Sequence, residues 1–357
     1  MKNKTNPNLQ IYGATTMMTH LSALVQEMEG VRLAKDIEAV HRMRVASRRL
    51  RATLPLFGQQ LAGKRHLVWI KAVRGITRAL GEARDNDVQI EHVGKFLESI
   101  QPPNRSGVRR LLLRLRQQRL ALQPKVLKEL NKFEKSGLVT EMVQKLAPFD
   151  IYHDRLDDND PGLLKLADRA IRAQLEEFLG FDGIVDLPER VEELHAMRIS
   201  AKHLRYTLET FAPLFEDGLK IHLKAMRSAQ DMLGAIHDCD IWAIYIPQFM
   251  DEERLRTIEY FGTVRPFKRL VSGLNLYQDA RRSERETTYA TFRDTWRSWK
   301  SEGLWNNLAA ALDARLTPVL ALPPTPNEDA AEEITDPVET TPSENPDLRP
   351  AAGSDSF

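Results

Sequence analysis

The chain has 357 residues, of which 42% are hydrophobic and 28% are charged, and it contains a single cysteine. This length and apolar content allow two domains, or one large duplicated domain, with a packed core. The lone Cys239 excludes a disulfide framework, and the polar N-terminus is unlike a signal peptide. Charges interrupt every apolar stretch before it reaches the roughly 18 residues of a membrane span. We therefore expect a soluble, cytoplasmic protein with no membrane segment.

Charge is distributed unevenly along the chain, although the formal net charge is only +1. Residues 323–357 contain seven prolines and nine acidic residues against Arg349 alone, so this segment carries −8 and the rest of the chain carries +9. A segment of this composition cannot bury enough apolar surface to order itself, which predicts a disordered acidic tail. The tail either competes with anions for the basic body or serves only as a solubilising extension.

Apolar residues of the body recur at three- and four-residue steps, which is typical of amphipathic helices. No stretch shows the sustained alternation of a strand, so we expect an all-α protein. After a flexible N-terminus at residues 1–8, the expected helices of the first half span 9–30, a segment ending at Gly58, 64–81, 88–99, 109–133 and 138–146. Those of the second half span 163–179, 191–215 and 220–234. A loop is expected at 82–87.

Two copies of one charged pattern dominate the sequence. Each copy places a histidine and three basic residues within about 80° of one another on a helical wheel, so each forms one cationic stripe, here called a ladder. The first ladder is His41, Arg44, Arg48 and Arg51, and the second is His195, Arg198, Lys202 and Arg205. Like charges on neighbouring helical turns repel, so two ladders indicate a polyanionic ligand that offsets the repulsion.

The repetition extends beyond the ladders. At an offset of 154 residues, eight of the seventeen positions from 41 to 57 are identical, and at 153 the matches include Gly81 with Gly234 and Asp85 with Asp238. Towards the ends of the halves the offset becomes 166. We therefore expect two related helical bundles, a first repeat at 9–149 and a second at 163–322, joined by a linker at 150–162.

A second basic stripe follows each ladder, and it extends the candidate anion-binding surface. Arginine offers a planar fork of donors for phosphate oxygens and lysine a compact charge, although a solvated or salt-bridged role is the alternative for each residue. The candidates are His41, Arg44, Arg48, Arg49, Arg51, Lys71, Arg74, Arg78, His195, Arg198, Lys202, Arg205, Lys220, Lys224 and Arg227. Weaker candidates for the rim of this surface are Arg116, Arg119, Arg282 and Arg285.

The histidines and the paired aspartates have several interpretations. His41 and His195 are best explained as proton-coupled phosphate contacts, with orientation of a neighbouring arginine, metal ligation and general acid–base work as alternatives. The pairs Asp85/Asp87 and Asp238/Asp240 are expected to begin helices, cap their free amides and hold arginine side chains of the neighbouring stripe. Binding of a cation is the alternative for these pairs. We expect no metal and no cofactor.

The repeated pattern resembles a known family. Each His-x-x-Arg-x-x-x-basic-x-x-Arg ladder is followed some 40 residues later by Leu-Gly-x-x-x-Asp-x-Asp, and this arrangement is similar to the CHAD domain, the conserved histidine α-helical domain, over about residues 9–322. The resemblance implies two four-helix bundles related by a pseudo-two-fold axis, with basic helices lining a central groove or pore. It also implies binding of inorganic polyphosphate, often with recruitment to polyphosphate granules.

Many members of that family also carry a triphosphatase tunnel domain marked by Glu-x-Glu-x-Lys, and this motif does not occur here. We therefore expect a stand-alone, non-enzymatic polyphosphate-binding protein, whose acidic tail could contact granule proteins. A generic polyanion or nucleic-acid binder is the main alternative, although aromatic stacking platforms are lacking. An enzyme of phosphate-chain metabolism ranks third, because neither a P-loop nor a nucleophile with a base is recognisable.

The second repeat is less basic than the first. Arg48-Arg49 of the first repeat corresponds to Lys202-His203, Arg78 to Asp231 and Arg84 to His237. We expect the second half to bind the anion more weakly.

Overall fold

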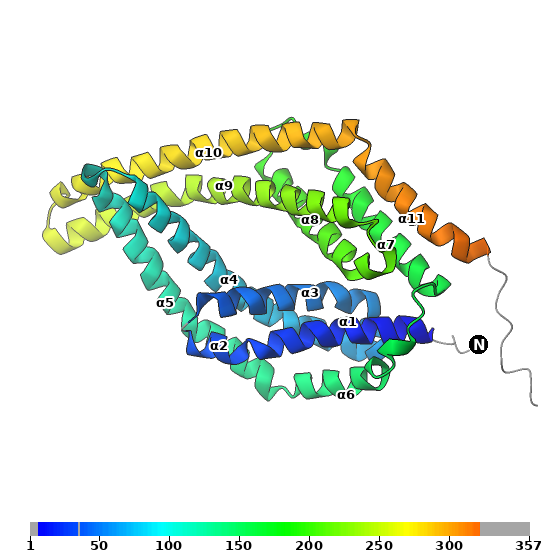
Figure 1. Ribbon diagram of the computed structural model, residues 1–357. Helices are drawn as coiled ribbons and strands as arrows, with labels where there is room; N and C mark the ends of the chain where they lie inside the picture. Colours follow the sequence, from blue (N-terminus) through cyan, green and yellow to red (C-terminus); the bar gives the residue numbers. More distant parts are fainter. Residues whose placement is uncertain (1–5, 35, 322–357) are drawn as a thin grey trace, which may run out of the picture. The chain divides into compact units, whose positions relative to one another are not determined.

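The polypeptide folds as a succession of long helices joined by short turns (Figure 1). This computed structural model describes residues 6–34 and 36–321. Nearly all of these residues are helical and none of them lies in a strand, so the predicted all-α fold is confirmed. The acidic tail at 323–357 lies outside the described residues, and the chain up to Ala321 forms one compact unit.

Eleven α-helices occur in the described part of the chain. Those of the first half are α1 (Pro7–Gln26), α2 (Met28–Leu33), α3 (Ile37–Ala62), α4 (His66–Ser99), α5 (Arg105–Lys135) and α6 (Leu138–Asp150). Those of the second half are α7 (Pro161–Leu179), α8 (Val191–Phe211), α9 (Lys220–Phe261), α10 (Lys268–Ser301) and α11 (Leu304–Ala321). No helix of residues 6–34 and 36–321 combines the length and the apolar content that crossing a bilayer requires.

Local sequence explains where several helices begin and end. The side chains of Asn6, Asp36 and Asp160 accept hydrogen bonds from free amides at the starts of α1, α3 and α7. Gly137 and Gly303 both adopt a φ of 67°, which L side chains rarely adopt, and they separate α5 from α6 and α10 from α11. These two glycines are 166 residues apart, the offset at which the two halves correspond.

Several expected helix boundaries are wrong. The predicted loop at 82–87 lies inside α4, because this segment contains neither glycine nor proline and its aspartates are held by arginines of adjacent helices. Likewise, α3 continues through the buried Gly58 to Ala62 and ends at Gly63, whose φ is 53°. The helix predicted at 220–234 is too short as well, because α9 continues through Gly234 to Phe261. Both α4 and α9 are therefore long, continuous helices.

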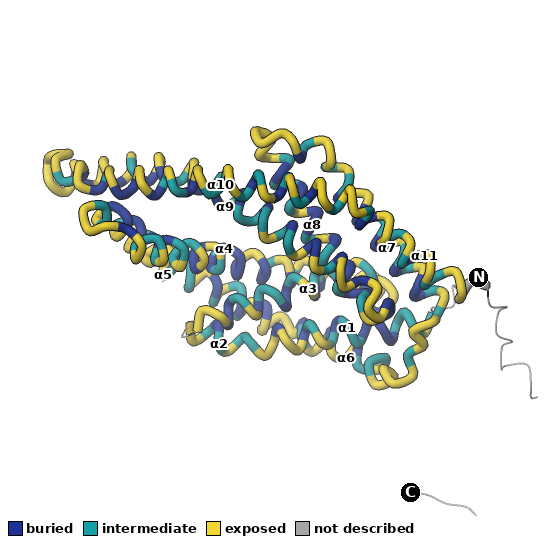
Figure 2. The backbone as a smooth tube through the Cα atoms, turned by 45° about the horizontal axis from the view of Figure 1, so that its top comes forward, coloured by how far each residue is buried: buried dark blue, intermediate teal, exposed yellow. Residues whose placement is uncertain are grey.

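Buried residues form two clusters, and both draw on the two halves of the chain. The larger cluster includes Tyr12, Phe57 and Phe211, whose rings lie about 6 Å apart in pairs, and the Tyr12 hydroxyl donates a hydrogen bond to the carbonyl of Thr210 at 2.6 Å. The smaller cluster joins the far ends of α4, α5, α9 and α10. Figure 2 shows buried residues on the facing sides of the helices and exposed residues on their outer sides. The halves therefore share their core.

Helices α5 and α10 cross at two glycines that leave almost no space between the backbones. A Cβ atom on Gly107 would lie 2.0 Å from the carbonyl oxygen of Leu270, and one on Gly273 would lie 2.0 Å from that of Asn104. At the offset of 166, Gly107 corresponds to Gly273 and Asn104 to Leu270, so each half makes the same contact with the other. Only glycine permits this approach.

We expect Gly107→Ala and Gly273→Ala each to lower the free energy of unfolding by about 1–3 kcal/mol, because the added methyl group forces the helices apart. Urea unfolding followed by circular dichroism measures the change. Gly94→Ala is the matched control: its Cβ would meet no atom within 4 Å in the interior of α4, and it should stabilise the protein by up to about 1 kcal/mol. Equal effects of the three substitutions would contradict the close crossing.

Candidate anion-binding site

The two ladders lie on α3 and α8, which pack against each other. The buried ring of Tyr206 lies between them: the guanidinium carbon of Arg48 is 5.1 Å from the ring centroid and that of Arg205 is 4.8 Å from it. Cation–π contacts of this kind stabilise each guanidinium without neutralising its charge. Cations of the two halves thus converge on one surface, which we call the shared surface, formed by Arg44, Arg48, Arg198, Lys202 and Arg205.

Burial, reinforced by neighbouring like charges, perturbs the protonation of this surface. Burial, followed by the charges of Arg198, Arg48 and Arg44, lowers the pKa of Lys202 to about 7. Burial also lowers the pKa of Arg48 to about 10, with Arg44, Arg205 and Arg198 acting in the same direction. The free protein therefore holds this cluster of charges at an energetic cost.

Several guanidinium donors of the shared surface are unused. The Nε atoms of Arg44, Arg198 and Arg205 are buried and have no hydrogen-bond partner among the described residues. The Arg44 and Arg198 side chains pass close to glycines: a Cβ atom on Gly81 would lie 3.6 Å from Arg44 Nε, and one on Gly234 would lie 3.6 Å from Arg198 Nε. The same contact thus occurs at corresponding positions of the two halves.

Acidic side chains neutralise only part of this charge. Asp85 lies 3.4 Å from Arg44, and its own side chain is 70% exposed, so the pair is weak. Glu209, which was not among the predicted residues, accepts a hydrogen bond from Arg49 at 3.3 Å and lies 3.5 Å from Arg205. Its place four residues after Arg205 on the same helix was the sequence signal for this pairing.

Arg49, Lys220 and Arg227 lie together next to the shared surface, and Glu209 and Tyr206 border both regions. They line a pocket of about 520 Å³ with His20 and Glu209. Arg227 approaches Glu209 at 4.0 Å. Adjacent arginines of α3 therefore differ in surroundings, because Arg48 contacts Tyr206 among the cations whereas Arg49 pairs with Glu209.

The remaining basic candidates occupy the edges of these regions. Arg74 of α4 lies near enough to Arg51 of α3 to contribute to the lowering of its pKa, second to burial. The other members of the second stripes are exposed: Lys71 and Arg78 on α4, and Lys224 on α9. Of the weaker rim candidates, Arg116 and Arg282 are also exposed.

The capping role predicted for the paired aspartates is wrong. Asp85 and Asp87 lie in the middle of α4, and Asp238 and Asp240 lie in the middle of α9, where the backbone amides are already hydrogen-bonded within the helix. Among residues 6–34 and 36–321, no three histidine, cysteine or acidic side chains cluster in a way that could hold a metal.

The aspartates do hold arginines, in two corresponding pairs, but these arginines lie on α5 and α10 and do not belong to the neighbouring stripe as predicted. Asp87 accepts a hydrogen bond from Arg119 at 2.8 Å, and Asp240 accepts one from Arg285. The side chains of these two arginines are only 14% and 19% exposed. Arg119 and Arg285 therefore join helices α4 to α5 and α9 to α10, whereas the sequence placed them at a binding rim.

The ladder histidines differ in their partners. Burial lowers the pKa of His41, with Arg84 as the next cause. His195 faces His237 of α9, with the two Nδ1 atoms 3.1 Å apart, and burial together with Arg198 lowers the pKa of both histidines, that of His237 to about 4. Arg84 and His237 were not among the candidates, although they occupy corresponding positions in the Leu-Gly-x-x-x-Asp-x-Asp segments.

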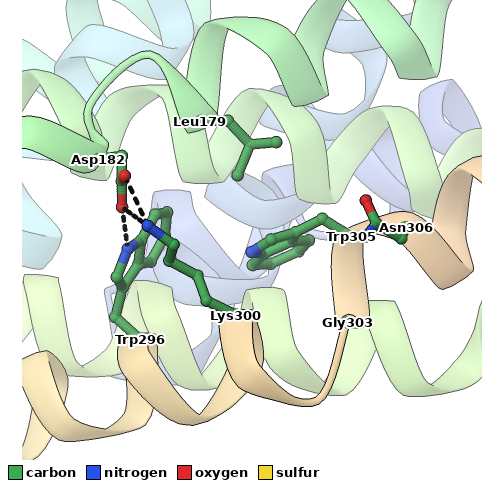
Figure 3. A pocket seen from close by; sticks show the side chains of 7 residues that line it. All are labelled: Leu179, Asp182, Trp296, Lys300, Gly303, Trp305 and Asn306. Atoms are coloured by element: carbon green, nitrogen blue, oxygen red, sulfur yellow. Dashed lines mark hydrogen bonds and ion pairs between the residues drawn. The ribbon is translucent and has the colours of Figure 1, made fainter.

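A separate pocket of about 280 Å³ lies between α7, α10 and α11 and is lined by Trp296, Trp305 and Lys300 (Figure 3). Asp182 accepts hydrogen bonds from the Trp296 indole at 2.7 Å and from the Lys300 ammonium group at 2.7 Å. The lysine charge is therefore already neutralised. This pocket contains none of the ladder residues and does not belong to the shared surface.

Fold and site together define an all-α protein in which basic helices from two corresponding halves face each other. The chain belongs to the CHAD domain family, because the family model for the CHAD domain matches residues 15–246. No curated protein sequence matches the chain.

Two solved structures share the fold. The crystal structure of the CHAD domain from the plant Ricinus communis superposes with a TM-score of 0.59 at 21% sequence identity, over 80% of this chain and 91% of that one. PptA from Streptomyces chartreusis superposes with a TM-score of 0.52 at 16% identity, over 81% of this chain and 99% of that one.

We expect Asp87→Ala to lower the free energy of unfolding by about 3–5 kcal/mol, because it leaves the guanidinium of Arg119 buried without its partner. Asp85→Ala removes an equal charge from an exposed position two residues away and should change the stability by less than about 1 kcal/mol. Guanidinium chloride unfolding measures both. If Asp87→Ala were as mild as Asp85→Ala, the Asp87–Arg119 pair would have no structural role.

Proposed function

We propose that this protein binds inorganic polyphosphate on the shared surface and does so without transforming it. The observation that carries the proposal is the convergence of five cations from α3 and α8, two of which contact Tyr206, while the Nε atoms of three have no hydrogen-bond partner among the described residues. Such a cluster is unfavourable in the free protein and becomes favourable when a polyanion supplies both charge and hydrogen-bond acceptors.

The chemistry of the surface favours a phosphate chain over a nucleic acid. Polyphosphate offers repeated anionic oxygens and no bases, so its receptor needs only charge and spacing. Tyr206 is 6% exposed and lies between two guanidinium groups, so its ring is inaccessible to a nucleobase. Stacking of bases on aromatic side chains contributes much of the affinity of proteins for single-stranded nucleic acids, and this contribution is lacking here. The family resemblance supports the same ligand, and with it an association with polyphosphate granules.

We expect the triple variant Arg44→Ala/Arg48→Ala/Arg198→Ala to bind long-chain polyphosphate at least about a hundredfold more weakly, because each charge-assisted contact contributes about 1.5–3 kcal/mol. The fold should persist, since removing clustered cations relieves repulsion. Isothermal titration calorimetry gives the affinity and circular dichroism the fold. The matched control removes three exposed cations of α5, Lys128, Lys132 and Lys135, and should bind nearly as well as the parent. Unchanged affinity of the first variant would place the ligand elsewhere.

The same titration with single-stranded DNA of equal charge, at two salt concentrations, distinguishes the ligand classes. Polyphosphate affinity should fall steeply with salt, because binding neutralises several phosphates and releases counterions. Strong binding of polyphosphate with much weaker binding of DNA supports the proposal. Equal binding of the two polymers would leave only a generic polyanion surface.

We expect polyphosphate affinity to fall as the pH rises from about 7 to 10. The pKa of Lys202 is about 7 in the free protein, and a bound polyanion raises it towards its ordinary value of 10.5, so binding takes up a proton in this interval. Calorimetry at constant ionic strength measures the trend. Lys202→Arg should flatten it, because arginine keeps its charge. A parent protein with flat affinity over this range would exclude Lys202 from the contact.

A further inference from the structure

His195 and His237 form a pair that is too close to hold two protons between them. Their Nδ1 atoms are 3.1 Å apart, and their ring centroids are separated by 4.2 Å at an interplanar angle of 33°. A neutral imidazole carries one N–H, so at this distance one Nδ1 donates and the other accepts. A second proton on the facing nitrogens would replace this hydrogen bond with repulsion between two N–H groups, and it would leave one of the two rings as a charged imidazolium.

The surroundings of the pair also oppose a second proton. Arg198 and Lys202 of α8 lie close enough to lower the pKa of both histidines. The groups that face these two cations from other helices are Arg48 and Arg44 of α3, Asp85 of α4 and Asp238 of α9, and Asp238 in turn faces Glu284 of α10. Neither histidine is hydrogen-bonded to an acid among the described residues. The pair is therefore neutral at physiological pH.

The corresponding position of the first half carries a permanent charge. Arg84 stands where His237 stands in the second half, and it lies close enough to His41 to lower its pKa. Its Nη1 atom is buried, lies 3.7 Å from Glu38 and has no hydrogen-bond partner among the described residues. Each half thus places a nitrogen-bearing side chain beside its ladder histidine. In the first half this side chain is a permanently charged arginine, and in the second half it is a titratable histidine.

We propose that His195 and His237 form a proton-coupled phosphate contact, which is neutral in the free protein and takes up a proton from solvent when a phosphate chain occupies the adjoining surface beside Arg198 and Lys202. This inference rests on the proposed function. A phosphate oxygen next to the pair supplies the negative charge that a second proton requires, and it accepts a hydrogen bond from the ring. The position of His237 in the second half therefore contributes a charge only when protons are available, whereas Arg84 at the corresponding position of the first half keeps its charge at any pH.

The test exchanges the residues at the two corresponding positions, Arg84 and His237. Calorimetric titration with polyphosphate of defined length at pH 5.5, in two buffers of different ionisation enthalpy, counts the protons taken up on binding. At this pH Lys202 is charged in both states and contributes nothing. We expect the parent to take up about one proton more than His237→Arg. Arg84→His, which builds the histidine pair in the first half, should raise the uptake by a similar amount.

Two further measurements keep the outcome interpretable. His237→Asn, a smaller and uncharged substitution, should also abolish the extra uptake if the arginine variant fails to fold. Proton NMR titration of the free protein should show both rings neutral at pH 6, with new resonances on addition of polyphosphate.

Equal proton uptake by the parent, His237→Arg and His237→Asn would overturn the inference, as would ordinary titration near pH 6.5 of both rings in the free protein. A parent and variants that bind no polyphosphate at any pH would contradict the proposed function instead.

Discussion

The contact between α3 and α8 is the constraint on which the rest of the structure depends, because it brings together two sets of like charges. Apolar burial around Phe57, Phe211 and Tyr12 lies on the same two helices and on α1, and it offsets the repulsion between the ladders. The hydrophobic core therefore holds the mutually repelling cations of α3 and α8 close together. A polyanion bound there would remove this repulsion, and the relief would contribute to the binding free energy.

Arginine plays two distinct roles in this protein, and burial of a partner carboxylate separates them. Arg119 and Arg285 are held by largely buried aspartates and tie neighbouring helices together, so their charges are already neutralised. Arg44 and Arg198 keep unpaired donors over glycines of α4 and α9. A Cβ atom at either glycine would meet the arginine at 3.6 Å, an ordinary van der Waals distance, so the guanidinium lies close against the helix surface. Composition alone cannot distinguish these two kinds of arginine.

Periodicity and repetition in the sequence predict the helical fold and the ladders, because both depend on residues a few positions apart. They fail where the outcome depends on partners distant in sequence. The segment 82–87 is polar and reads as a loop, yet Arg119 of α5 stabilises it as helix by pairing with Asp87. The spacing of four residues from Arg205 was a local signal for Glu209, but its hydrogen bond with Arg49, 160 residues away, follows from no local pattern. The pairing of His195 with His237 likewise requires knowledge of how α8 packs on α9.

The crossing of α5 and α10 at Gly107 and Gly273 has a consequence for ligand binding. It gives the two halves a second attachment, distant in sequence from the contact of α3 with α8. With two attachments the halves cannot pivot about either one alone, so the spacing between the arginines of α3 and α8 is set before any anion arrives. Under the proposed function, the protein would then order few side chains on association, and a flexible chain of phosphates would bear most of the entropic cost.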